Sequence, residues 1–285
     1  MMRLAGSILA LLLTVNLVTV NPVLADRLDD IARTGTIKIA HRTDATPFSF
    51  VGSDNKATGF TVDLCNRVVD RIKSRLKLNA LNVEWVPVTT ESRFEAVASG
   101  KADMECGSST ATLGRMELVD FSSFIFLEST GLLVKKDAGI NAGSDLAGKK
   151  IAVISGTTNE KAVTAINERT QLKAVIVAVK DRAEGISLLE SGGADAFASD
   201  KLLLLGAQVQ KAQTLTMLPE DLSIEPYAIV LPRGDWRLRL AVNAALADIY
   251  RSGQIVEVFN KWFAQIGLQP GPLATAIYIL GAMSE

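Results

Sequence analysis

Donor groups suited to holding a carboxylate are concentrated in one stretch of the chain, residues 105–115, which reads ECGSSTATLGR. Four hydroxyl side chains follow Glu105, and no further acidic residue precedes Arg115. Hydroxyl groups, free backbone N–H groups at the end of a strand and a guanidinium together can bind a carboxylate. The stretch therefore indicates an anion site, although by itself it fits a polar turn with a surface arginine equally well.

Two further positions offer the same kind of chemistry. Gly156, Thr157 and Thr158 come directly before a predicted helix, and the N-terminus of a helix attracts anions. Arg42 follows a predicted strand over residues 36–40. Each position also has a purely structural alternative, because a threonine caps a helix and a charge at a strand end is commonly solvated.

Predicted strands and helices alternate around these positions. Strands over 36–40, 83–88 and 102–105 enclose two helices: one over 60–78, with an apolar residue every four positions, and one that begins with a capping box at 92–95. This order indicates parallel strands in an α/β lobe. Ligands bind beyond the carboxyl ends of such strands, which is where the donor groups lie.

A second unit with the same alternation occupies residues 151–198. Extended segments over 121–134 and 224–231 bracket it, and two helices over 236–251 and 255–266 follow. We expect the bracketing segments to cross between two lobes and the last helices to return to the first lobe. Two lobes joined in this way form a cleft that can close on a small ligand.

A short internal repeat supports two similar lobes. The segment EAVASGKAD at residues 95–103 is matched 92 residues later by SLLESGGAD, and in both a helix end is followed by Ser-Gly, one residue, Ala-Asp and a strand. The same offset relates Ser108 to Asp200 and Thr90 to Arg182. Each lobe thus places polar groups at equivalent points, although a match this short also arises by chance because Ser-Gly commonly ends helices.

Composition excludes some classes of function. The 285 residues are 48% hydrophobic, which is ample for more than one lobe, and the formal net charge of −1 gives no electrostatic case for nucleic acid. With one histidine and two cysteines, a zinc or haem site built from His and Cys is not expected. We predict no cofactor.

The first 25 residues have the pattern of a cleaved export signal, and the alternative is a membrane anchor. Arg3 precedes an apolar segment over 9–20, and Val23-Leu24-Ala25 is a small-residue cleavage site without a cysteine for lipid attachment. The pattern predicts a periplasmic protein. In that compartment Cys65 and Cys106 can pair, and the alternative is two buried free thiols.

Several motifs together resemble the periplasmic amino-acid-binding proteins of ABC uptake systems, most of all the glutamate/aspartate-binding members. They lie at residues 41–50, 59–64, 105–115, 145–149, 155–158 and 189–192. The resemblance implies a type II periplasmic-binding-protein fold of the α/β class, with a mostly parallel sheet flanked by helices in each lobe and a two-strand hinge. It places lobe 1 at 26–128 plus 228–285 and lobe 2 at 129–227.

The resemblance also implies a partner and a role for each site residue. The protein would be a monomer that delivers an amino acid to ABC permease subunits in the inner membrane. Three groups of residues would hold the ligand: Arg115, Thr110 and the N–H groups of Thr157 and Thr158 at the α-carboxylate, Ser108 and Asp200 at the α-ammonium, and Arg42, Thr90 and Arg93 at a distal carboxylate.

Arg182 departs from the family pattern, in which a histidine is expected. It can donate to a ligand carboxylate, or Asp181 or Glu184 can pair with it instead, so the order of preference among glutamate, aspartate, glutamine and asparagine stays open. Counting Arg42, Arg93, Arg115 and Arg182 against Asp200 predicts an excess of positive charge, which a dicarboxylic ligand would neutralise.

The scaffold leaves other functions open. An enzyme of the dehydratase type, acting on a prephenate-like or arogenate-like substrate, needs a general acid or base beside the leaving group. Asp200 is the one carboxylate among the predicted cleft residues, and pairing with an ammonium is the better use of it. A sensory module would need a signalling domain, which we do not find in the sequence.

Overall fold

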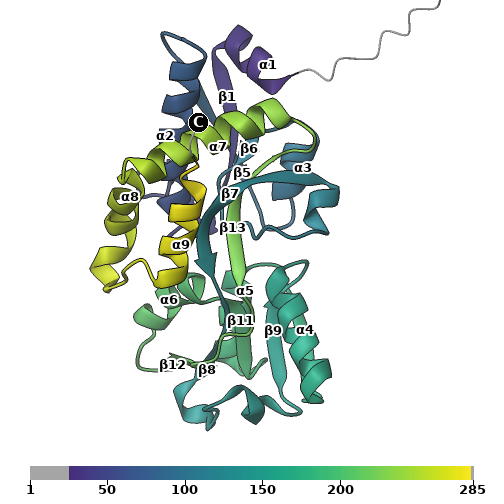
Figure 1. The fold of residues 1–285 in the computed structure, drawn as a ribbon. Coiled ribbons are helices and arrows are strands. Elements are labelled where there is room, and N and C mark those ends of the chain that lie inside the picture. Colours follow the sequence, from purple (N-terminus) through teal and green to yellow (C-terminus); the bar gives the residue numbers. More distant parts are fainter. Residues whose placement is uncertain (1–25, 284–285) are drawn as a thin grey trace, which may run out of the picture.

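The computed structural model describes residues 26–283, so the predicted export signal lies outside the described residues. Figure 1 shows two α/β lobes stacked end to end and joined by long strands that run from one lobe toward the other. The predicted fold class is confirmed. The limits of the lobes in the sequence stay a prediction.

The sheet of lobe 1 has the strand order β5-β1-β6-β13-β7. β1 is parallel to β5 and β6, whereas β13 is antiparallel to β6 and β7. Its strands are β1 (Thr36–Arg42), β5 (Asn82–Val88), β6 (Met104–Glu105), β7 (Val119–Glu128) and β13 (Glu225–Pro232). A small sheet formed by β2 (Asp44–Ala45), β3 (Ser49–Val51) and β4 (Ala57–Thr58) follows β1.

The sheet of lobe 2 repeats this arrangement in the order β10-β9-β11-β8-β12. β9 is parallel to β10 and β11, and β8 is antiparallel to β11 and β12. The strands are β8 (Thr130–Lys135), β9 (Lys150–Ile154), β10 (Val175–Val179), β11 (Ala196–Asp200) and β12 (Leu215–Met217). Each sheet therefore has three neighbouring parallel strands, as predicted, and one strand that runs against all the others, β13 in lobe 1 and β8 in lobe 2.

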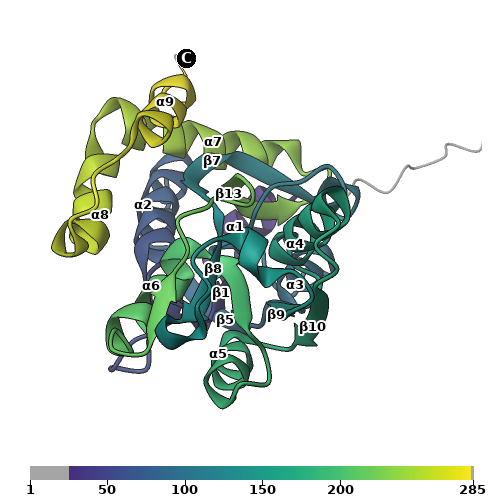
Figure 2. The same cartoon turned by 90° about the horizontal axis from the view of Figure 1, so that it is seen from below.

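Helices cover both sheets. Lobe 1 carries α1 (Arg27–Thr34), α2 (Phe60–Arg75), α3 (Arg93–Ala98), α7 (Trp236–Arg251), α8 (Gln254–Phe263) and α9 (Pro272–Gly281). α4 (Thr158–Thr170), α5 (Arg182–Ser191) and α6 (Lys201–Gln210) pack on the sheet of lobe 2, and Figure 2 shows them around it from below. Short 3₁₀ turns are η1 (Arg115–Glu117), η2 (Lys136–Ala138), η3 (Gly143–Leu146) and η4 (Ala264–Ile266). Within residues 26–283, no helix is both long and apolar enough to cross a membrane.

The internal repeat has a structural counterpart. Asp103 accepts a hydrogen bond of 2.8 Å from the N–H of Lys38, which lies in β1. Asp195 accepts one of the same length from the N–H of Lys150, at the start of β9. In both lobes the carboxylate of the Ala-Asp motif thus binds a backbone N–H of the strand that comes first in the sequence among the three parallel strands, β1 in lobe 1 and β9 in lobe 2.

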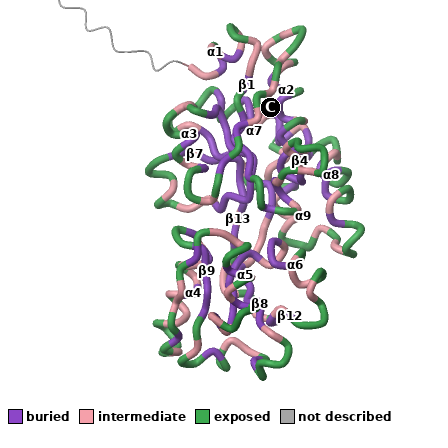
Figure 3. The backbone as a smooth tube through the Cα atoms, turned by 180° about the vertical axis from the view of Figure 1, so that it is seen from behind, coloured by how far each residue is buried: buried purple, intermediate pink, exposed green. Residues whose placement is uncertain are grey.

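Buried residues occur in both lobes and follow the strands of the sheets (Figure 3), and most of them are apolar. In lobe 2, Leu132 and Val134 of β8 belong to the core on one face of the sheet and Leu133 to the core on the other. Because both faces are covered, β8 reads as a continuous apolar run rather than an alternating one. In lobe 1, the aromatic rings of Phe48 and Tyr227 lie 5.1 Å apart within the largest core.

The chain crosses between the lobes twice, at Ser129 and through residues 218–224. Ser129 alone separates β7 from β8, and β13 begins at Glu225 opposite Glu128 of β7. Adjacent antiparallel strands therefore form the hinge that the sequence predicts, and the chain makes both crossings side by side.

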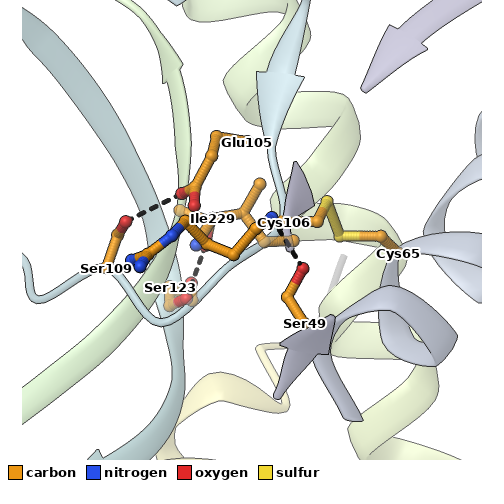
Figure 4. The surroundings of a disulfide bond; sticks show 9 residues. Ser49, Cys65, Glu105, Cys106, Ser109, Ser123 and Ile229 are labelled. Atoms are coloured by element: carbon orange, nitrogen blue, oxygen red, sulfur yellow. Dashed lines mark hydrogen bonds between the residues drawn. A yellow bond between two sulfur atoms is a disulfide. The ribbon is translucent and has the colours of Figure 1, made fainter. Parts of the chain in front are cut away.

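Cys65 and Cys106 form a disulfide between α2 and the residue that follows β6, with Cα atoms 6.4 Å apart. Figure 4 shows this bond beside Glu105, whose carboxylate accepts a hydrogen bond of 2.8 Å from Ser109. The disulfide thus anchors the start of the hydroxyl-rich stretch to the core of lobe 1. The pairing is the first of the two alternatives that the sequence left open.

One local prediction is wrong. Ser92 does not cap α3 with its side chain. Its hydroxyl instead accepts a hydrogen bond of 3.1 Å from the N–H of Thr89, and the Thr89 hydroxyl accepts one from the N–H of Ser92. This reciprocal turn orders the loop that carries Thr90 toward the other lobe.

Candidate ligand-binding site

A narrow cleft lies between the lobes. Most of its lining is polar and comes from the ends of strands and the starts of helices. The lining residues are Arg42, Thr90, Arg93, Ser108, Thr110, Ile154, Thr157, Thr158, Asn159, Arg182, Ser199, Asp200 and Leu203. The structure therefore brings together nine of the ten residues that the sequence predicts for the site. Arg115 is the exception.

Three arginines supply buried donors to the cleft. Arg42 ends β1 and is 2% exposed, Arg93 begins α3 and is 4% exposed, and the side chain of Arg182, which begins α5, is 11% exposed. The Nε atom of each is buried and has no hydrogen-bond partner in the protein. A buried N–H left in this state costs about 1–3 kcal/mol. These three lining residues therefore have donor groups that the protein itself does not use.

Arg93 lies at the centre of this cationic cluster. One of its terminal N–H groups donates to the backbone carbonyl of Ser108 at 3.3 Å. Burial, and then the nearby guanidinium groups of Arg42 and Arg115, lower the pKa of Arg93 to about 9. The side chain is cationic at neutral pH, and an added anion beside it would restore its pKa.

Asp200 ends β11 on the opposite side of the cleft. Its carboxylate accepts a hydrogen bond of 2.8 Å from the side-chain amide of Asn159 and one of 2.6 Å from the Tyr227 hydroxyl. Burial raises the pKa of Asp200, while the hydrogen bonds from Tyr227 and Asn159 act in the opposite direction. A buried carboxylate held in a fixed orientation is suited to pairing with an ammonium group.

The start of α4 contributes Thr157, Thr158 and Asn159 to the lining of the cleft. Thr157 caps the helix, because its hydroxyl accepts from the N–H of Glu160 and donates 2.6 Å to the carbonyl of Ile154. The hydroxyl of Thr158 donates 2.5 Å to Glu225 of the hinge. The Gly-Thr-Thr motif is thus both a helix cap and part of the cleft lining, so its two predicted uses are compatible.

Glu225 is a hinge residue that sequence reasoning missed. It is 1% exposed, and four hydroxyl groups donate to its carboxylate: Thr110 and Thr158 to one oxygen, Ser223 and Thr130 to the other. A glutamate at the start of the otherwise apolar segment 225–231 was the available signal. It joins a loop of lobe 1 to a helix of lobe 2.

Arg115, in η1, is not among the residues that line the cleft. It donates 2.8 Å to the carbonyl of Thr110, and its guanidinium lies 4.7 Å from the centre of the Phe94 ring. Burial lowers the pKa of Arg115, and Glu225 is the largest opposing influence. In this position Arg115 orders the residues that line the cleft. A direct contact with the ligand carboxylate stays a prediction.

The partner of Arg182 is neither of the two acids that the sequence suggested. Asp181 accepts from the N–H of Glu184, and Glu184 accepts from the N–H of Lys180, so both serve the start of α5. Arg182 instead donates a hydrogen bond of 2.6 Å to the backbone carbonyl of Asp44, in the other lobe. Its guanidinium lies 3.6 Å from the Asp44 carboxylate.

The structure reduces the predicted charge excess. That prediction counted four guanidinium groups against Asp200 alone, but Asp44 pairs with Arg42 and Arg182. The charges of Glu105 and Glu225 also act on Arg93 and Arg115. Burial raises the pKa of Glu105, which weakens its role as a counter-ion. Asp44 is two residues from Arg42 in the sequence, whereas Glu105 and Glu225 approach the arginines only in the folded chain, where residue spacing could not reveal them.

Comparison with known proteins agrees with this geometry. Residues 37–265 match the family described as bacterial extracellular solute-binding proteins, family 3. The chain belongs to this family. The family assignment covers both lobes and the hinge, and it fits a cleft that lies between them.

Two relatives of this solute-binding protein match almost the whole chain. It is 37% identical to an L-glutamate/L-aspartate-binding protein of Pseudomonas aeruginosa, over 93% of this chain and 89% of the relative. It is 33% identical to a glutamate/aspartate import solute-binding protein of Escherichia coli K12, over 91% of this chain and 87% of the relative.

Among solved structures, this solute-binding protein is similar to an ancestral amino-acid-binding protein described as a precursor of cyclohexadienyl dehydratase. The TM-score is 0.71 at 30% sequence identity, with 83% of this chain and 99% of the other covered. The same fold thus occurs in a protein named as the forerunner of an enzyme, so the cleft residues must decide the function.

Proposed function

We propose that the protein binds an acidic amino acid, glutamate or aspartate, in this cleft. The same cleft would bind the amides glutamine and asparagine with lower affinity. The observation that carries the proposal is the set of three buried Nε–H groups without partners, on Arg42, Arg93 and Arg182. A ligand carboxylate is the acceptor that best matches a guanidinium in charge and shape. The names of the two relatives support the same ligand class.

The opposite side of the cleft suits the ammonium group of an amino acid. Asp200 offers a fixed carboxylate there, and Ser108 is its equivalent in the internal repeat. The N–H groups of Thr157 and Thr158 at the start of α4 would then hold the α-carboxylate, and Thr110 would lie beside it with its hydroxyl bonded to Glu225. Arg42, Thr90, Arg93 and Arg182 would face the distal group, with Arg115 supporting Thr110.

Closure of the two lobes about the hinge would enclose the ligand. We place lobe 1 at residues 26–128 plus 228–285 and lobe 2 at 129–227, with residues 225–227 at the start of β13 as part of the hinge between them. The protein would act in the periplasm after removal of residues 1–25, as a monomer, and would deliver its ligand to the permease of an ABC importer. Relatives named as import proteins support this role.

A binding role is favoured over a dehydratase role by the chemistry of the lining. Asp200 is the carboxylate among the residues that line the cleft, and it already accepts two hydrogen bonds. An acid in that state is a poor proton donor to a leaving group. We therefore propose that no bond is made or broken in the cleft.

A thermal-shift panel of the twenty amino acids, followed by calorimetry of the hits, tests the proposal. A ligand present at 100 times its Kd stabilises the folded state by about 2.7 kcal/mol. Acidic amino acids should give the largest shifts. Arg93→Ala and Arg115→Ala should each weaken binding by about a hundredfold or more, because each leaves buried charge without a partner.

The matched control is Arg33→Ala, which removes an exposed arginine paired with Asp30 and should leave binding unchanged. If neither glutamate nor aspartate shifts the melting temperature, or if Arg93→Ala binds as the wild type does, the assignment of the ligand is wrong.

A further inference from the structure

Asp44 is the chain's own anion at the distal end of the cleft. It begins β2, two residues after Arg42, and one oxygen of its carboxylate accepts 2.6 Å from the Arg42 guanidinium. Its other oxygen lies 3.6 Å from the Arg182 guanidinium, which also donates to its backbone carbonyl. One aspartate of lobe 1 therefore contacts a cleft arginine from each lobe.

This arrangement changes the charge that a ligand meets. Arg42 and Arg182 alone would present two positive charges to a distal carboxylate. With Asp44 between them, the three side chains carry one net positive charge. A ligand carboxylate must then share the two guanidinium groups with a like charge or displace it, and like charges brought together in a site cost several kcal/mol. A neutral amide does not meet this repulsion.

The surroundings of Asp44 allow it to be displaced. Its side chain is 36% exposed, whereas that of Arg42 is 2% exposed. Asp44 and Arg182 also line a larger groove outside the cleft, and Thr90 and Arg182 line both spaces. The pair thus lies at the boundary between the inner cleft and the outer groove, where the carboxylate has solvent to turn toward.

The alternative counter-ions are already engaged. Asp181 and Glu184 accept backbone N–H groups at the start of α5. Among the residues the structure describes, the carboxylate placed to neutralise both Arg42 and Arg182 is therefore that of Asp44.

From this geometry we propose that Asp44 is a specificity-determining residue that sets the preference between acidic amino acids and their amides. Its carboxylate pairs with Arg42 and Arg182 and so competes with a ligand carboxylate for them. It thereby reduces the difference in affinity between acidic amino acids and their amides. The inference rests on the proposed function and adds to it which residue tunes the choice of ligand.

Calorimetry of Asp44→Asn with glutamate, aspartate, glutamine and asparagine tests the inference. The amide keeps the size and an acceptor but removes the charge. The Kd for glutamate should fall about tenfold, the Kd for glutamine should change less than about threefold, and their ratio should move toward glutamate. Asp44→Glu keeps the charge and should leave the ratio within about threefold of the wild type.

Asp54→Asn is the matched control, because Asp54 is an exposed aspartate of the same lobe, paired only weakly with Lys56 at 3.7 Å. It should not change the ratio. An unchanged ratio in Asp44→Asn, or weaker binding of glutamate, would overturn the inference and make Asp44 a residue that merely positions the arginines. If the wild type binds none of the four amino acids, the proposed function fails instead, so the two failures are distinguishable.

Discussion

The hydroxyl of Tyr227, in β13, donates a hydrogen bond of 2.6 Å to the carboxylate of Asp200, at the end of β11. Tyr227 is fully buried, and its ring packs against Phe48 in the core of lobe 1. Asp200 lines the cleft from lobe 2. The largest core of the molecule is therefore tied directly to the acid that we propose as the partner of the ligand ammonium.

Tyr227→Phe should weaken amino-acid binding by about tenfold, because a hydrogen bond to a charged group contributes about 1.5–3 kcal/mol. Burial, and then the nearby Asp200, raise the pKa of Tyr227 well above its ordinary value, so the hydroxyl remains a donor. Without it the pKa of Asp200 would rise further. Calorimetry with glutamate measures the effect. Tyr278→Phe removes a buried hydroxyl that donates to Ile125 and should bind normally; equal losses in both variants would contradict the role of Tyr227.

Removing the hinge acid should destabilise the fold. Glu225→Ala leaves buried hydroxyl groups without their acceptor, and some of them can pair again, since Thr130 and Ser223 already lie 2.7 Å apart. We expect a loss of about 3 kcal/mol in the free energy of unfolding. Urea denaturation measures it, with Glu257→Ala, an exposed glutamate, as the control. Similar values for the two variants would show that the hinge network contributes nothing.

The disulfide should contribute stability without affecting the choice of ligand. It joins residues 41 positions apart, and a loop of that length corresponds to about 4 kcal/mol in the chain-entropy account. The double variant Cys65→Ser, Cys106→Ser should lose about 2–4 kcal/mol and keep the wild-type order of ligands. Unfolding with and without reductant measures this. Reductant should destabilise the wild type alone, and an effect on the double variant would point to another cause.

Stability should fall as the pH rises, owing in part to Glu128. Burial, followed by the nearby charge of Asp200, raises the pKa of Glu128 from 4.5 to about 8. Between pH 4.5 and about pH 8 the folded protein therefore keeps a proton on Glu128 that the unfolded chain releases. The contribution of Glu128 to the free energy of unfolding is complete below pH 4.5 and is lost as the pH rises through about 8. Glu128 alone can change the free energy of unfolding by at most about 1.4 kcal/mol per pH unit.

Glu128→Gln should flatten this dependence between pH 5.5 and pH 8, as measured by urea denaturation. Its amide oxygen can still accept from the N–H of Leu202. Asp221→Asn is the control, because hydrogen bonds from Lys201 and Ser129 lower the pKa of that acid and its contribution is constant over the same range. If Glu128→Gln keeps the wild-type slope, Glu128 does not carry the pH dependence.

Local features of the site were predictable from the sequence. The capping role of Thr157 follows from the residues next to it, and the repeat correctly related Ser108 to Asp200 and Thr90 to Arg182, all of which line the cleft. Such features depend on backbone propensity and on the regular alternation of strands and helices, both of which are written along the chain.

Contacts between the lobes were not predictable in the same way. Asp44 and Arg182 are 138 positions apart, and their contact depends on the angle between the lobes. Glu225 meets Thr158 for the same reason, across 67 positions. Ser92 failed as a cap because a competing hydroxyl, Thr89, lies three residues away. Sequence spacing reports which groups exist near a site, whereas the pairing among them is decided by tertiary geometry.

The side-by-side position of the two crossings restricts how the molecule can move. Paired backbone segments permit bending but resist sliding or separation of the halves. Occupation of the cleft therefore changes one feature that is visible from outside, the angle between the two lobes. A protein that touches both halves at once could distinguish a loaded molecule from an unloaded one without ever contacting the cargo.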